Sequence, residues 1–133
     1  MYPADPGEAW KDQVLVAHVQ SCEAEVVRIP FIVGEDRSRT WIIRRVDGGL
    51  ELKHDHRHED GTPNEITQYG GTTKAPGTRR SQSFPADAYT AALIPEAATN
   101  EWFLSFSEDG RELTYYLERH GMPRFKAVLV RDE

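Results

Sequence analysis

The chain has 133 residues, a formal net charge of -6 and a single cysteine, Cys22. This length suits one domain, 1–133, which needs neither a disulfide nor a metal in order to fold. The acidic balance disfavours nucleic acid as a partner, because phosphate binding requires clustered Lys and Arg. The sequence contains no apolar run that approaches a membrane span and no recognisable signal peptide, so we expect a cytoplasmic protein without membrane partners.

The N-terminal part combines an irregular segment with the first strands. Residues 1–7 contain two prolines and a glycine, and they are expected to form an irregular tail. Residues 8–22 fit either a helix or a strand, since short apolar runs cannot be assigned by periodicity, and we expect a short helix or turn that leads into a strand. Residues 24–33 are rich in Val, Ile and Phe and predict a strand, in which Pro30 indicates an edge position, a bulge or a kink.

A hairpin follows, with strands predicted at residues 39–46 and 50–59 on either side of Asp47, Gly48 and Gly49. Asp-Gly and Gly-Gly both supply the positive φ angles that two-residue hairpin turns require. Because side chains alternate between the two faces of a strand, the parity of each residue is fixed whichever turn forms.

The exact turn decides which residues lie opposite each other. A turn at Asp47-Gly48 places Trp41 opposite His54, whereas a turn one residue later places Trp41 opposite His56. In both registers one face carries the same set of side chains, namely Arg39, Trp41, Ile43, Arg45, Leu50, Leu52, His54, His56 and His58.

The second half of the chain is also predicted to be mostly β. Residues 65–69 predict a short strand closed by Gly70-Gly71, and residues 72–83 predict a mobile loop that ends in a poor strand. One or two helical turns are expected around residues 86–93, before Pro95. Apolar residues then alternate in three segments, which predict an antiparallel meander over residues 101–107, 112–119 and 124–131.

Together these elements predict an all-β fold. Short strands at regular spacing, joined by successive hairpins, indicate a single antiparallel up-and-down β-barrel of about eight strands, with short helices near the N-terminus and around residues 86–93. The interior of a barrel of about eight strands can be filled by side chains or can hold one small ligand.

Three of the five histidines, His54, His56 and His58, occupy alternate positions and suggest a metal site. Alternate residues on a strand lie roughly 6.6 to 7 Å apart, so an adjacent pair can reach one ion, whereas the outer two lie about 13 Å apart. Three-fold ligation from this strand alone is therefore improbable. A further ligand would have to come from another strand, for which the candidates are Glu65, Tyr69 and His120.

The same stretch resembles the first motif of the cupin family, Gly-x5-His-x-His-x3or4-Glu-x6-Gly, at Gly48, His54 and His56. Asp60 stands in place of the glutamate, the closing glycine falls at a different spacing, and residues 72–133 contain no second cupin motif. This resemblance implies a metal-dependent enzyme that binds a divalent transition metal through two of the three histidines.

A second resemblance is architectural. A β-rich chain of this length that ends in the hairpin around Tyr115 to Phe125 is similar to the small lipocalin-like (calycin) barrels among uncharacterised bacterial proteins, which implies a ligand-holding, non-catalytic barrel. Imidazoles and an arginine beside an apolar surface suit a small polar or anionic ligand. On this hypothesis the chain has no catalytic residue, metal or cofactor, it is a monomer or homodimer, and the ligand contacts Arg39, Trp41, Ile43, Leu52, His54, His56, His58 and Tyr69.

A third hypothesis assigns the histidines a structural role. In that case they pack at the rim of the barrel and form hydrogen bonds with their neighbours. The ligand cavity is our principal hypothesis, and the metal site and the structural role remain its alternatives.

Overall fold

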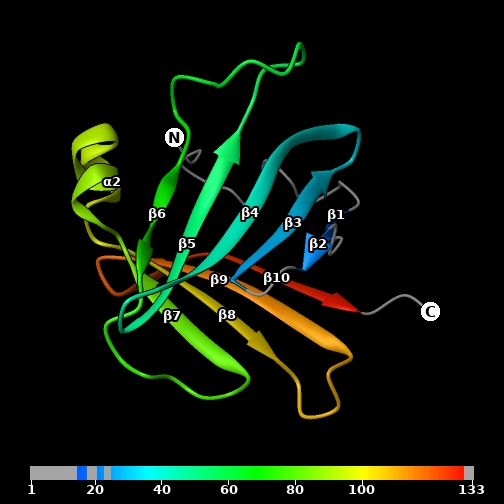
Figure 1. Cartoon of the computed structure of the whole chain (residues 1–133), viewed down its shortest axis with the longest axis vertical. Helices are drawn as coiled ribbons and strands as arrows, with labels where there is room; N and C mark the ends of the chain where they lie inside the picture. Colours follow the sequence, from blue (N-terminus) through cyan, green and yellow to red (C-terminus); the bar gives the residue numbers. More distant parts are fainter. Residues whose placement is uncertain (1–14, 18–20, 23–24, 131–133) are drawn as a thin grey trace.

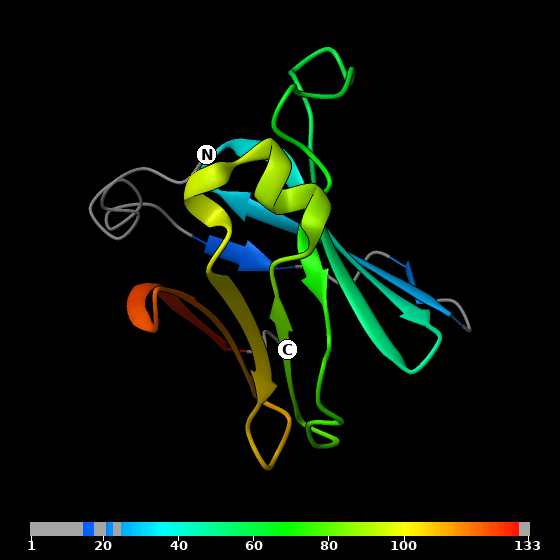
Figure 2. The same ribbon diagram turned by 90° about the vertical axis from the view of Figure 1, so that its left-hand side faces the viewer.

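The computed structural model describes residues 15–17, 21–22 and 25–130. The tail predicted at residues 1–7 lies outside these ranges, and the described part of the ambiguous segment 8–22 consists of strands. The described strands form two antiparallel sheets that pack face to face (Figures 1 and 2). The first sheet contains β1 (Leu15–Ala17), β2 (Ser21–Cys22), β3 (Val26–Val33), β4 (Asp36–Val46), β5 (Gly49–His56) and β6 (Tyr69–Thr72). The second sheet contains β7 (Ser81–Pro85), β8 (Asn100–Phe106), β9 (Glu112–Arg119) and β10 (Met122–Val130).

The prediction of an all-β fold is confirmed. The first sheet has the order β1-β3-β4-β5-β6, with β2 also paired to β3, and the second has the order β10-β9-β8-β7. Short hairpins join β3 to β4, β4 to β5, β8 to β9 and β9 to β10, as the turn residues predict, whereas longer segments, 57–68 and 86–99, join β5 to β6 and β7 to β8. The C-terminal meander is formed by β8, β9 and β10.

The single closed barrel of about eight strands is not confirmed, because the described strands form two sheets. The chain passes from the first sheet to the second between β6 and β7, where the described pairing is one isolated bridge from Gly71 to Ala86. At the other side, β1 and β10 approach each other without pairing among the described residues. A closed barrel requires continuous hydrogen bonding around the circuit, which the short β6 does not provide.

The hairpin between β4 and β5 has the register set by a turn at Asp47-Gly48. Gly48 adopts a φ of 80°, which is the left-handed conformation that this turn requires. Trp41 therefore lies opposite His54, and Arg39 lies opposite His56. Pro30 pairs with Thr40 of β4, and on the other side of β3 it falls between the stretches that pair with β1 and with β2.

The predicted strand at residues 65–69 is wrong in its position, since β6 covers Tyr69–Thr72 and includes both glycines. The physical reason is a close approach of backbones. A Cβ at Gly70 would collide with the carbonyl oxygen of Leu52, and a Cβ at Gly71 would collide with that of Pro85. These glycines therefore form a strand where three segments of backbone meet, rather than the turn predicted from their flexibility.

The helix α2 (Ala88–Leu93) confirms the prediction around residues 86–93, and the 3-10 helix η1 (Pro95–Ala97) follows it. Asp87 caps α2, because its side chain accepts a hydrogen bond of 2.9 Å from the backbone N–H of Thr90. The helix lies beside β6, where the chain passes between the sheets (Figure 1). Neither described helix has the length and apolarity needed to cross a membrane.

The core lies between the two sheets and is rich in aromatic side chains. Its most deeply buried large residues come from both sheets and are Phe31, Trp41, Leu52, Phe84, Trp102 and Leu117. Buried residues alternate along a strand as the period of two predicts, for example Ile29, Phe31 and Val33 in β3.

Candidate functional site

The face of β4 and β5 that points toward the second sheet contains six of the eight residues predicted to bind a ligand, the exceptions being His58 and Tyr69. We call it the inward face, and its members within the two strands are Arg39, Trp41, Ile43, Arg45, Leu50, Leu52, His54 and His56. His58 has the same parity but lies beyond the end of β5. The face has a histidine end, near His54 and His56, and a hairpin end, near Arg45 and Leu50.

His54 is buried, with 2% of its surface exposed, and both of its ring nitrogens form hydrogen bonds. Its Nδ1 donates to the carbonyl oxygen of Tyr69 at 3.0 Å, which leaves Nε2 to accept from the hydroxyl of Tyr115 at 2.9 Å. Burial lowers the pKa of His54 to about 4, so the ring is neutral at pH 7. His54 thus connects β5 to β6 and also to β9 in the opposite sheet.

Aromatic rings pack around His54 on several sides. The ring of Tyr69 stacks on it with a centroid distance of 4.6 Å, and that of Trp102 lies 5.2 Å away. Trp41 stacks on Tyr115 at 4.6 Å. Four of the predicted ligand residues, which are Trp41, Leu52, His54 and Tyr69, are therefore packed in the core. These contacts match what the structural hypothesis for the histidines expects.

The other predicted residues are less buried and do not converge on one point. Ile43 packs against the core. Arg39 donates from Nη1 to Oδ2 of Asp36 at 2.9 Å. His58 is exposed, and its Nε2 lies 3.5 Å from Oε1 of Glu65.

His56 is half-buried, and its Nδ1 donates to the carbonyl oxygen of Ile66 at 3.3 Å. Burial, together with the nearby charge of Arg39, lowers its pKa. The three histidines thus occupy a buried, a half-buried and an exposed environment.

The donor set of a metal site is not assembled within residues 15–17, 21–22 and 25–130, where no three His, Cys, Asp or Glu residues are grouped to hold an ion. His54 uses both ring nitrogens for hydrogen bonds. The three further candidate ligands lie apart from one another. Tyr69 packs on His54, and Glu65 approaches the exposed His58. His120, in the turn after β9, contacts Thr99.

A pocket of about 300 Å³ lies at the hairpin end of the same face. Both sheets contribute to it, since Gln82 of β7 occupies an alternate position with the buried Phe84 and so points toward the first sheet. None of the eight predicted residues lines this pocket. Its lining residues are Arg45, Val46, Gly48, Gly49, Leu50, Thr73, Ala75, Pro76 and Gln82.

The polar groups of this pocket have unused bonding capacity. The guanidinium of Arg45 is exposed and forms neither an ion pair nor a hydrogen bond with the described residues. Oγ1 of Thr73 accepts a hydrogen bond of 3.0 Å from the backbone N–H of Leu50, so its hydroxyl proton is available to a ligand. Nε2 of Gln82 donates to the carbonyl oxygen of Thr78 at 2.9 Å, which leaves Oε1 as an acceptor.

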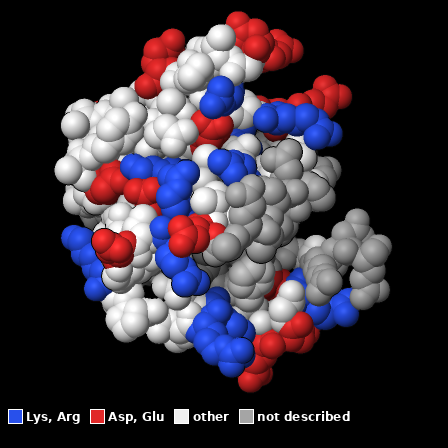
Figure 3. Space-filling view, viewed as in Figure 1, with Lys and Arg blue, Asp and Glu red and all other residues white. Residues whose placement is uncertain are grey.

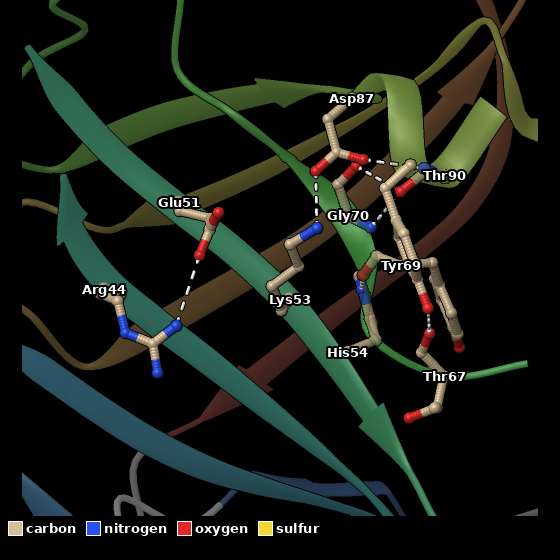
Figure 4. Close-up of polar contacts among 10 residues, drawn as sticks. Arg44, Glu51, Lys53, His54, Thr67, Tyr69, Gly70, Asp87 and Thr90 are labelled. Atoms are coloured by element: carbon tan, nitrogen blue, oxygen red, sulfur yellow. Dashed lines mark hydrogen bonds and ion pairs between the residues drawn. The ribbon is translucent and has the colours of Figure 1, made fainter. Parts of the chain in front are cut away.

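The opposite, outward face of β4 and β5 carries charges that are paired with each other. Nη1 of Arg44 lies 3.4 Å from Oε1 of Glu51, and Nζ of Lys53 lies 2.6 Å from Oδ2 of Asp87. Figure 4 shows both pairs, with Lys53 and His54 on opposite sides of β5. Basic and acidic groups also lie side by side over the face seen in Figure 3. These outward charges therefore have partners, whereas Arg45 has none within the part of the chain that the structure describes.

Sequence reasoning placed the candidate site on β4 and β5 and did not include the residues of the pocket that come from the segment 73–82. That segment was predicted to be a mobile loop that ends in a poor strand, and its own residues contain no motif. The signal that could have indicated the pocket was Arg45, which shares the parity of the inward face but lies at the end away from the histidines.

A comparison of the chain with protein-family models, with curated proteins and with solved structures finds no match. The function must therefore be argued from the side chains of this protein alone.

Proposed function

We propose that this protein binds a small polar or anionic ligand without converting it chemically, and that the ligand occupies the pocket at the hairpin end of the inward face. The observation that carries this proposal is the position of Arg45. Its guanidinium has no partner among the described residues and stands at a pocket of about 300 Å³ that also presents a hydroxyl and an amide oxygen. A concave, mostly apolar site with a few convergent polar groups is typical of small-molecule binding.

The site supports binding better than catalysis. None of the described lining residues is His, Cys, Asp, Glu or Lys, so the pocket offers no common nucleophile apart from a threonine hydroxyl and no general base to activate it. The alternative function, a metal-dependent enzyme that uses the histidines of β5, is not supported by any observation comparable to the position of Arg45. The lipocalin-like resemblance, the cytoplasmic location, the absence of nucleic-acid and membrane partners and the state of monomer or homodimer stay predictions from the sequence.

Thermal unfolding in the presence of a panel of small metabolites tests the proposal. A ligand at about 100 times its Kd stabilises the folded state by roughly 2.7 kcal/mol, which raises the Tm of a chain of this size by several degrees. At least one anionic compound should stabilise the wild type but not the Arg45→Gln variant. The matched control is Arg44→Gln, which removes the neighbouring arginine on the outward face and should leave the stabilisation unchanged.

The proposal would be contradicted in two ways. Either no compound raises the Tm of the wild type, or the stabilisation persists in Arg45→Gln and disappears when His56 is replaced by Gln, which would locate binding at the histidine end.

A further inference from the structure

The geometry points to a ligand of one chemical class, a small organic monocarboxylate with an apolar body. This inference rests on the proposed function of the hairpin-end pocket and adds to it the identity of the head group and the nature of the body.

The head group is indicated by the donors of the pocket. Arg45 is the one charged side chain among its described lining residues. A guanidinium presents two parallel N–H groups that match the two oxygens of a carboxylate, and the hydroxyl of Thr73 adds a further donor. These donors can satisfy a carboxylate from more than one direction.

The charges around the pocket favour a ligand with a single negative charge. Asp47 lies in the turn between Val46 and Gly48, both of which line the pocket. The chain as a whole has a formal net charge of -6. A phosphate dianion would bring a second negative charge that Arg45, the one charged side chain among the described lining residues, cannot neutralise on a chain of net negative charge. The site therefore favours a monoanion over phosphate.

The body of the ligand is indicated by the apolar walls. Val46 and Leu50 come from the hairpin, and Ala75 and Pro76 come from the segment after β6. A volume of about 300 Å³ lies at the low end of the range for ligand pockets, so the body must be short.

The position of the hydroxyl depends on a glycine. A Cβ at Gly49 would collide with Oγ1 of Thr73, so the absence of a side chain at Gly49 allows Thr73 to pack against the start of β5. The bond from the N–H of Leu50 then fixes that oxygen at the wall of the pocket. The polar and apolar parts of the site are thus held side by side, as an amphipathic carboxylate requires.

Calorimetric titrations with three probes test this assignment, namely hexanoate, the neutral isostere hexanamide and inorganic phosphate. Hexanoate should bind the wild type and Arg44→Gln with equal Kd. Hexanamide should bind the wild type about tenfold more weakly or worse, because a charge-assisted hydrogen-bond pair is lost. In Arg45→Gln the Kd of hexanoate should rise to that of hexanamide, and phosphate should not displace hexanoate from the wild type.

The outcomes separate this inference from the proposed function. If hexanamide binds as tightly as hexanoate, or if phosphate displaces it, the monocarboxylate assignment is overturned. The pocket itself then still stands, provided that Ala75→Trp, which fills it, abolishes binding. If hexanoate does not bind while another compound of the metabolite panel does, only the assignment fails. If neither hexanoate nor any panel compound binds the wild type, both fail.

Discussion

The imidazole of His54 and the phenol of Tyr115 share a hydrogen bond of 2.9 Å that joins the two sheets. The carbonyl oxygen of Tyr69 holds the proton on Nδ1 of His54, so the hydroxyl of Tyr115 is the donor in this bond. Both side chains are at most 2% exposed. At the histidine end of the inward face, a buried hydrogen bond within the aromatic core therefore links the two sheets.

Replacing Tyr115 with Phe should lower the free energy of unfolding by about 1 to 3 kcal/mol, because it leaves the buried Nε2 of His54 without a donor. Denaturation by urea, monitored by tryptophan fluorescence, would measure this loss. The adjacent Tyr116 provides a matched control, since its hydroxyl donates to Oε2 of Glu118 on the outward side of β9. A loss in Tyr116→Phe as large as that in Tyr115→Phe would contradict the account.

The stability of the protein should fall as the pH decreases from about 6.5 to about 4. The pKa of His54 is lowered to about 4 by burial, so the unfolded chain takes up this proton first. The stabilising effect of the neutral ring is complete above the unfolded pKa of about 6.5, and about 3 kcal/mol is lost by pH 4 at 1.36 kcal/mol per pKa unit.

Urea denaturation across this pH range, together with NMR titration of the imidazole signals, would measure the effect. His56 also has a lowered pKa and adds to the loss in the same direction. The variant His54→Gln should lose most of the slope, whereas His58→Gln, at an exposed position, should retain it. A His54 pKa near 6.5 in the folded protein would refute the prediction.

The ion pair between Lys53 and Asp87 should stabilise the attachment of α2. Asp87 both pairs with Nζ of Lys53 at 2.6 Å and caps the helix through the N–H of Thr90. Asp87→Ala should therefore lower the free energy of unfolding by about 2 kcal/mol, most of it from the lost cap. The control is Glu51→Gln, whose partner Arg44 is largely solvated, and it should cost at most about 0.5 kcal/mol. Equal losses would show that Asp87 has no special role.

The sequence predicts the strands correctly wherever the pattern of one segment and its adjoining turn is sufficient to determine the local structure. Alternation of apolar residues is sufficient to identify β4, β5 and the strands of the meander, since the period of two depends only on the backbone. The parity of Trp41 and His54 follows in the same way. The turn left two registers open, and the structure selects the one with Asp47-Gly48 at the turn.

The remainder depended on contacts between residues far apart in the sequence. Whether the inward face is filled or open at a given end depends on the opposite sheet, which places Tyr115 against His54 but Gln82 near Leu50. Nothing within the histidine stretch contains that information. The predicted site and the pocket that the structure shows therefore lie on the same face, at opposite ends.

The two glycines of β6 illustrate the same limit, because their neighbours determine their conformation. Gly71→Ala should lower the free energy of unfolding by about 2 kcal/mol or more, since the new Cβ would collide with the carbonyl oxygen of Pro85. Gly110→Ala serves as a comparison, because its φ of 72° is strained for alanine but its surroundings are open, so it should cost only about 1 kcal/mol. Thermal unfolding of both variants would rank them, and the reverse order would contradict the close approach.

The central claim is that the inward face of β4 and β5 binds a ligand at its hairpin end and is structural at its histidine end. Mapping of amide chemical shifts in a ¹⁵N-labelled sample titrated with hexanoate tests this most directly. Shifts are expected at Val46 to Leu50 and at Thr73 to Ala75, with His54 and Tyr69 unmoved. Shifts that centre on His54, His56 and Tyr69 and leave the hairpin unchanged would contradict it.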